Sequence, residues 1–152
     1  MIAPALVVAA IALVAPWVSK VDRARYAADI AAAAPNLVTA KAMVATAAVE
    51  SGFRGRIERC ECTAKECDGG LAHGIYQLHA YHFAGHTAEE VCTDNGLASE
   101  LAARTLTWLA TRVGGMEEAL RVYVGTSVRR EDPRVKRRLE LFELLMEVHP
   151  DV

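Results

Sequence analysis

Residues 43–53 read MVATAAVESGF, a run of small apolar residues that closes on a glutamate, a serine and a glycine. Within the wider segment 37–51, apolar residues recur at the three- and four-residue spacing of one helix face. Thr39 stands where an N-cap is expected, and Gly52 can take the left-handed conformation that ends a helix. The stretch therefore predicts a helix whose last turn carries Glu50.

The composition of the chain favours helices elsewhere too. Of its 152 residues 53% are hydrophobic, with alanine prominent among them, whereas aromatic residues make up only 6%. Alanine has the highest helix propensity of the common residues. Further helices are predicted after Thr87, over 97–113, over 116–124 and from residue 132 onward. We therefore expect a mainly α fold, built as one compact domain with an appendage.

The N-terminus is the most unusual part of the sequence. From Ile2 to Val18 every residue is apolar or proline. Such a run reaches the lower limit of a membrane-spanning helix, about 17–25 residues. We expect it to direct the chain to a membrane and to continue as one helix until Pro35, although a buried core helix is the alternative. The predicted organisation is an anchor segment over 1–34 and a second domain over 35–152.

The four cysteines, Cys60, Cys62, Cys67 and Cys92, form an even set that is typical of two disulfides in an extracytoplasmic protein. A bridge between Cys60 and Cys62 would close a strained ring, which leaves Cys92 to pair with either of them. In the cytoplasm the rival would be a four-thiolate zinc site, although the C-x-C-x4-C spacing lacks the usual paired knuckles. We prefer two disulfides.

The charge pattern beside the apolar run conflicts with an extracytoplasmic location. Lys20, Arg23 and Arg25 follow it, and the positive-inside rule would hold this end of the domain in the cytoplasm. The cysteines and the apolar run together outweigh this signal. We expect a domain of the cell envelope on the periplasmic, extracytoplasmic side, tethered to the inner membrane through residues 2–18. A phage-encoded, exported protein would have the same layout.

Three short motifs follow one another along the chain: MVATAAVESGF (43–53), GIYQL (74–78) and ALRVYVGT (119–126). In this order they resemble the three motifs of the soluble lytic transglycosylase and goose-type lysozyme families. The resemblance covers about residues 37–145. It implies a lysozyme-like domain that cleaves peptidoglycan glycan strands. We expect this domain to work as a monomer without a cofactor or metal.

The resemblance also implies roles for single residues. Glu50 would be the general acid and base, Gln77 would contact a sugar through its amide, and Tyr76 would offer an apolar face to a ring. Tyr123 would orient the catalytic carboxyl, and Ser51 would either bind substrate or only end the helix. The alternatives are an exposed glutamate at a helix end, a buried pair at a turn and a core tyrosine.

Physical arguments support an acid role for Glu50. A glycosidic oxygen is a poor leaving group, so its cleavage needs a proton donor with a pKa near the working pH. The negative end of a helix dipole disfavours the charged form of a carboxylate in the last turn. The apolar neighbours Val49 and Phe53 add desolvation in the same direction. We therefore expect a raised pKa for Glu50.

The reaction depends on whether a second carboxylate takes part. The resemblance implies a single-glutamate mechanism that gives 1,6-anhydro products at the bond between N-acetylmuramic acid and N-acetylglucosamine. Hydrolysis of the lysozyme type would need a second carboxylate about 5–9.5 Å away, and the loop after Glu50 offers Glu58, Glu61, Glu66 and Asp68. A third possibility is a non-catalytic module that binds glycan or a partner, because Val124-Gly125 replace the usual Asn-Ala of the third motif.

Two further groups of polar residues carry weaker signals. Four histidines, His73, His79, His82 and His86, suggest zinc, but loop histidines are more often solvated, and a zinc module is our third and weakest class. The net charge of −2 shows no bias toward nucleic acid. A basic run is expected to be a solvated helix start, or to attract anionic envelope polymers; it comprises Arg129, Arg130, Arg134, Lys136, Arg137 and Arg138.

Overall fold

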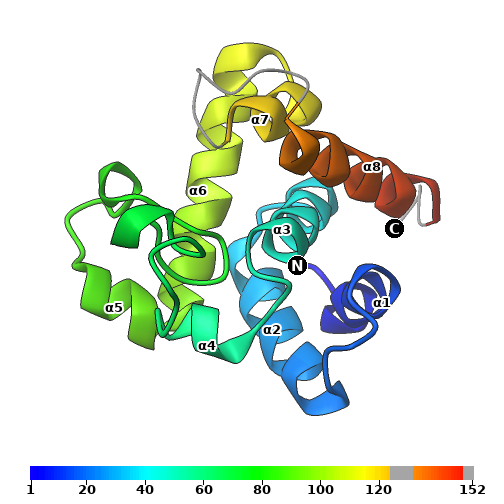
Figure 1. The fold of residues 1–152 in the computed structure, drawn as a ribbon. Helices are drawn as coiled ribbons and strands as arrows, with labels where there is room; N and C mark the ends of the chain where they lie inside the picture. The colour runs from blue at the N-terminus through cyan, green and yellow to red at the C-terminus, as the bar shows by residue number, and fades with distance from the viewer. Residues whose placement is uncertain (124–131, 149–152) are drawn as a thin grey trace.

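The computed structural model describes residues 1–123 and 132–148, and these are mainly helical, as predicted (Figure 1). A single isolated bridge, between His73 and Leu78, is the nearest approach to a β-strand in these residues. In chain order the elements are α1 (Pro4–Val14), α2 (Lys20–Ala33), α3 (Leu37–Glu50), α4 (Gly55–Glu58), the 3-10 turns η1 (Asp68–Gly70) and η2 (Ala80–His82), α5 (Ala88–Thr93), α6 (Asn95–Val113), α7 (Met116–Val122) and α8 (Pro133–Val148).

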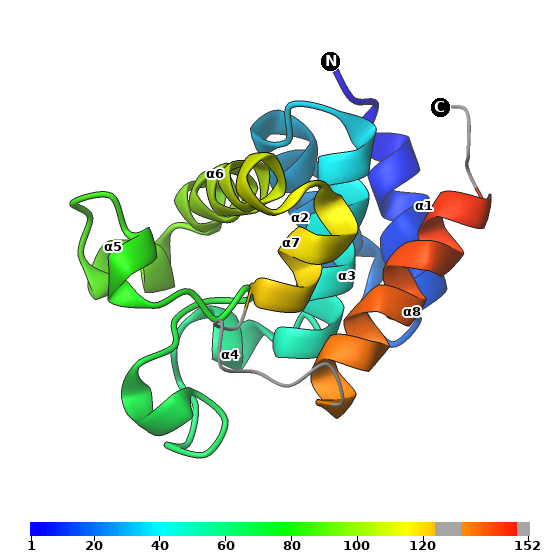
Figure 2. The same ribbon diagram turned by 90° about the horizontal axis from the view of Figure 1, so that it is seen from above.

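Helix α3 lies at the centre of the fold. It packs against α1, α2, α6, α7 and α8, which surround it in Figures 1 and 2. Every residue from Thr39 to Ala47 is buried, so no face of this segment is left to solvent. Its many alanines allow the neighbouring helices to approach closely while still removing apolar surface from water. The central helix therefore holds Glu50 on a rigid support.

The observed end of α3 agrees with the prediction from the sequence, whereas its observed N-cap differs from the predicted one. The helix ends at Glu50, and Gly52 takes the predicted left-handed conformation with φ of 60°. The N-cap, however, is Asn36, whose Oδ1 accepts from the backbone N–H of Thr39 at 2.9 Å. Asparagine is the stronger capping residue, and its side chain reaches the third residue of the helix. The prediction of Thr39 as the cap is wrong.

The predicted continuous N-terminal helix is also wrong. Pro16 disfavours the helical conformation of Ala15, where α1 has just ended. Ser19 then caps α2 by accepting from the backbone N–H of Asp22 at 3.0 Å. The chain therefore turns between two separate helices.

The apolar N-terminal run forms part of the main core. Within α1, Val7 and Ile11 are 2% and 0% exposed and belong to the same apolar cluster as α2, α3 and α6. Across residues 1–123 and 132–148, no helix combines the length and the apolar character needed to span a bilayer. The membrane contact and the domain boundary at residue 34 stay predictions.

Two disulfides hold the loop between α3 and α5. Cys60 pairs with Cys92 and joins the loop to α5, with Cα atoms 5.5 Å apart. Cys62 pairs with Cys67 and closes a small ring within the loop. The prediction of two disulfides is confirmed, with Cys60 as the partner of Cys92. Because all four thiols are used, the four-thiolate zinc site is wrong.

Helices α6 and α8 follow their predicted boundaries closely. Helix α7 begins at Met116 as predicted and ends at Val122, and its predicted end at Val124 lies outside the described residues. Helix α6 ends at Val113 and is capped by Gly114, whose φ of 92° suits a left-handed C-cap. Thr87 and Glu90 form the capping box predicted before α5. Helix α8 begins at Pro133, and its buried face is Val135, Arg138, Leu139, Leu141, Phe142 and Leu145. One member of that buried face is a charged residue.

Candidate active site

A cleft of about 300 Å³ opens beside the C-terminal end of α3. It lies where the end of α3, the disulfide loop, residues 77–79, the end of α7 and the start of α8 meet. Its lining therefore comes from five separate parts of the chain. The lining residues are Val49, Glu50, Lys65, Glu66, Asp68, Ala72, Gln77, His79, Tyr123 and Arg134.

Glu50 lies in this cleft with a largely buried side chain that is 5% exposed. Its Oε1 accepts a hydrogen bond from Nη2 of Arg138, whose side chain is 0% exposed. Burial raises the pKa of Glu50, and the positive charges of Arg138 and Arg134 oppose that shift. The alternative of an ordinary exposed glutamate is therefore wrong, because this carboxyl is desolvated and paired.

Arg138 is held by α7 as well as by Glu50. Its Nη1 donates to the backbone oxygen of Leu120 at 2.8 Å, near the end of α7. Its guanidinium carbon lies 5.4 Å from the centre of the Tyr123 ring, within the range of a cation–π contact. The cation is thus fixed on both sides, and it fixes the carboxylate in turn.

Tyr123 lies against Arg138 and lines the same cleft. It is buried, and its hydroxyl donates to the backbone oxygen of Tyr76 at 3.0 Å. Desolvation raises the pKa of Tyr123 well above its ordinary value, so the phenol stays neutral. The hydroxyl is hydrogen-bonded to the GIYQL segment, and the ring faces Arg138. Tyr123 therefore links the second and third motifs.

The remaining predicted residues divide between the cleft and the core. Gln77 lines the cleft, and its Nε2 donates to the backbone oxygen of Gly74 at 3.1 Å. Tyr76 is fully buried, with its hydroxyl 3.0 Å from that of Ser99. Ser51 is also fully buried, and its Oγ accepts from the backbone N–H of Phe53 at 3.1 Å. Tyr76 and Ser51 do not line the cleft.

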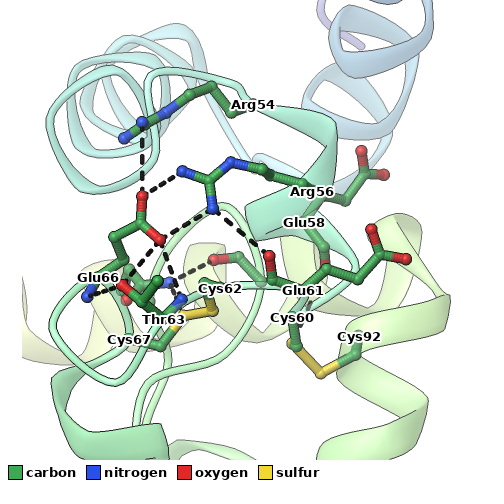
Figure 3. Close-up of a disulfide and its surroundings, with 12 residues drawn as sticks. Arg54, Arg56, Glu58, Cys60, Glu61, Cys62, Thr63, Glu66, Cys67 and Cys92 are labelled. Carbon is green, nitrogen blue, oxygen red and sulfur yellow. Dashed lines mark hydrogen bonds and ion pairs between the residues drawn. A yellow bond between two sulfur atoms is a disulfide. The ribbon is translucent and has the colours of Figure 1, made fainter.

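The disulfide loop contributes Lys65, Glu66, Asp68 and Ala72 to the cleft wall, and Figure 3 shows the contacts of Glu66 within this loop. Glu66 accepts from Arg56, with one Nη1–Oε2 distance of 2.8 Å, and from the backbone N–H of Thr63 at 2.9 Å. These donors lower the pKa of Glu66 far below its usual range. Cys62 and Cys67 bracket the segment, so the bridge between them fixes this wall.

The other acidic residues of the loop occupy different surroundings. Glu58 receives hydrogen bonds from Arg25 and from the hydroxyl of Tyr26, the latter at 2.8 Å, and does not line the cleft. Glu61 pairs with Arg59. Asp68 does line the cleft, is 70% exposed and lies 3.5 Å from Nε2 of His79. Of these four carboxylates, Glu66 and Asp68 share the cleft with Glu50.

The predicted basic run proves to be mixed. Arg129 and Arg130 lie outside the described residues, whereas Arg134 and Arg137 are exposed at the start of α8. Arg138 is fully buried, so the prediction of a solvated helix start is wrong for this residue. A signal for its burial was available, because Arg138 falls three residues after Val135 on the apolar stripe of α8.

The histidines make individual contacts rather than a cluster. Burial lowers the pKa of His82 to about 4, and its ring stacks on that of Tyr123 with centroids 6.2 Å apart. His73 lies against Phe83, and His86 lies near Glu90. Within the described ranges no three His, Cys, Asp or Glu side chains are grouped as metal ligands would be.

The arrangement can supply one proton from a desolvated carboxyl to a ligand in a solvent-open cleft. The paired arginine would stabilise the carboxylate left behind. Gln77, Asp68 and His79 offer polar atoms to that ligand along the same cleft. No protein-family model, no curated protein and no solved structure matches this chain.

Proposed function

We propose that this protein cleaves the glycan strands of peptidoglycan at the bond between N-acetylmuramic acid and N-acetylglucosamine, with Glu50 as general acid and base. The observation that carries the proposal is the burial of Glu50 in the wall of a solvent-open cleft, at the end of the central helix. The order of the three motifs along the chain supports the same activity. We also propose that this helical domain has a lysozyme-like fold.

The environment of Glu50 suits an acid that must give up its proton. Desolvation keeps the carboxyl protonated to a higher pH than that of a solvated glutamate. When the proton leaves, the new carboxylate lies beside Arg138, a cation already in place. Preorganised charge of this kind stabilises a developing ion without the cost of reorganising solvent.

The proposed reaction is transglycosylation. Glu50 protonates the glycosidic oxygen, and the bond from that oxygen to the anomeric carbon of the muramic sugar breaks while the sugar's own N-acetyl group assists. Glu50 then takes the proton of the sugar's 6-hydroxyl, whose oxygen closes on the anomeric carbon. The product is a 1,6-anhydro sugar, and Glu50 returns to its protonated form. Water is not consumed.

Hydrolysis is the second candidate, and Asp68 favours it. This aspartate lines the same cleft as Glu50 and is 70% exposed, so its carboxylate is open to water. A second carboxylate beside a water is what an inverting hydrolase requires. The products differ, because hydrolysis leaves a reducing end.

A non-catalytic glycan-binding module is the rival from another class. The buried pair of Glu50 and Arg138 favours it, since such a pair can serve structure alone. The test is digestion of purified peptidoglycan by wild type, by Glu50→Gln and by Glu143→Gln, a change on the exposed side of α8. We expect anhydro-muropeptides from wild type and Glu143→Gln, and a loss of at least about a hundredfold in Glu50→Gln. Equal activity in Glu50→Gln would refute its role.

We also propose an extracytoplasmic location in the cell envelope. The two disulfides support it, because such bonds persist in oxidising compartments. Peptidoglycan is found in that same compartment. Fractionation of cells that express the protein, with thiol counting on the native chain, would test the location.

A further inference from the structure

A second hollow adjoins the cleft on the other side of Glu50's helix end. Its volume is about 320 Å³, and it lies between the end of α1, the end of α3 and the start of α8. Val49 and Arg134 line both spaces, so the two lie next to each other. We call this hollow the side groove; it is lined chiefly by Val14, Trp17, Val49, Pro133, Arg134 and Arg137.

Trp17 forms an aromatic wall of the side groove. Its Nε1 donates to the backbone oxygen of Gly52 at 2.9 Å, which fixes the indole beside the end of α3. The residue is nevertheless 65% exposed. An indole whose only polar atom is already paired presents apolar surface to a ligand. Val14 and Pro133 extend this apolar surface.

Two arginines give the side groove its charge. The side chains of Arg134 and Arg137 are each 60% exposed. Their acidic neighbours, Asp132 and Glu140, lie 3.6 and 3.5 Å away, and such exposed ion pairs contribute little. Each guanidinium therefore keeps donors for a planar anion such as a carboxylate.

We propose that the side groove binds the carboxylate-bearing peptide stem of the strand whose glycan lies in the cleft; this inference rests on the proposed function. The stem branches from the muramic sugar through its lactyl group, beside the bond that Glu50 would protonate. It carries carboxylates that match the two arginines, and short aliphatic side chains that match Trp17 and Val14. Because Val49 and Arg134 line both spaces, a branched ligand that passes these two residues would reach the cleft and the side groove together.

The test compares two substrates prepared from the same peptidoglycan: intact strands, and strands stripped of their stems by an amidase. The variant is Arg137→Gln, because Arg137 lines the side groove but not the cleft. The matched control is Lys136→Gln, which removes the same charge from the preceding residue of α8, outside the side groove. Rates are compared as kcat/KM.

We expect wild type and Lys136→Gln to cleave intact strands about tenfold faster than stripped strands, the size of one charge-assisted hydrogen bond. Arg137→Gln should lose most of this preference while its rate on stripped strands stays unchanged. Equal rates of wild type on both substrates would overturn the inference. So would an equal fall of Arg137→Gln on both substrates, or the same loss in Lys136→Gln.

A binding measurement separates failure of the side groove from failure of the proposed reaction. The chain has two tryptophans, so Trp108→Phe leaves Trp17 as the sole indole reporter. Titration of this protein with a free stem pentapeptide should change its fluorescence, and adding Arg137→Gln should abolish the change. Arg137-dependent binding without any cleavage would retain the side groove and refute the enzyme. Cleavage without Arg137-dependent binding would refute the side groove as a binding site and retain the enzyme.

Discussion

Arg138 donates from Nη2 to Oε1 of Glu50 although 88 residues separate them in the sequence. The contact joins the first turns of α8 to the last turn of α3, and both side chains are largely shielded from solvent. Removing two charges from water is costly unless each is well paired. The pair therefore links the packing of α8 directly to the protonation of the proposed acid.

Replacement of Arg138 by methionine should raise the pKa of Glu50 further, because the guanidinium lowers it. A general acid with a higher pKa stays protonated to higher pH. The descending limb of kcat/KM against pH should therefore move to higher pH, while kcat falls. The measurement is a pH–rate profile on peptidoglycan, with Arg138→Lys as the control that keeps the charge. A limb that moves to lower pH would contradict the assignment.

The raised pKa of Glu50 should also appear in stability. A carboxyl whose folded pKa lies above its unfolded value of 4.5 stabilises the fold fully only below that value. This contribution is lost as pH rises through the folded pKa. Glu50→Gln does not titrate, so its stability relative to wild type should increase as pH rises above 4.5. Urea unfolding at a series of pH values measures the trend; a difference independent of pH would exclude a raised pKa.

Tyr123→Phe should separate the contribution of the ring of this residue from that of its hydroxyl. The change removes the 3.0 Å hydrogen bond to the backbone oxygen of Tyr76 and should cost about 1–2 kcal/mol of unfolding free energy. The phenyl ring would still lie beside Arg138, so activity should fall only a few-fold. Tyr123→Ala removes both contacts and should lower activity much more. Equal loss of activity in the two variants would assign a direct role to the hydroxyl.

The two disulfides should differ in their effects. Loop size predicts a loss of about 4 kcal/mol for the Cys60–Cys92 pair and about 2 kcal/mol for Cys62–Cys67 when both cysteines become alanine. The smaller ring, however, holds the cleft wall at Glu66. We therefore expect its removal to raise KM more, as measured by denaturant unfolding and steady-state kinetics. A larger rise in KM for the Cys60–Cys92 variant would contradict this view of the wall.

The local features of the fold followed from the sequence because neighbouring residues determine them. Gly52 and Gly114 end their helices by tolerating positive φ, and the Thr87–Glu90 spacing forms a capping box. Glu50 was placed in the last turn of a helix by the same kind of argument. The interruption of the N-terminal helix at Pro16 was equally local, and the long apolar run concealed it.

The sequence alone thus determined a mainly α chain with Glu50 at a helix end and two disulfides. Only the tertiary structure decided that Arg138 leaves the basic run to pair with Glu50, that Ser51 and Tyr76 belong to the core, and that Trp17 borders the side groove. Helix periodicity reports which residues share a face, whereas burial and pairing depend on which faces meet. The packing of α8 and α1 around α3 determined which of these residues are buried and which are paired.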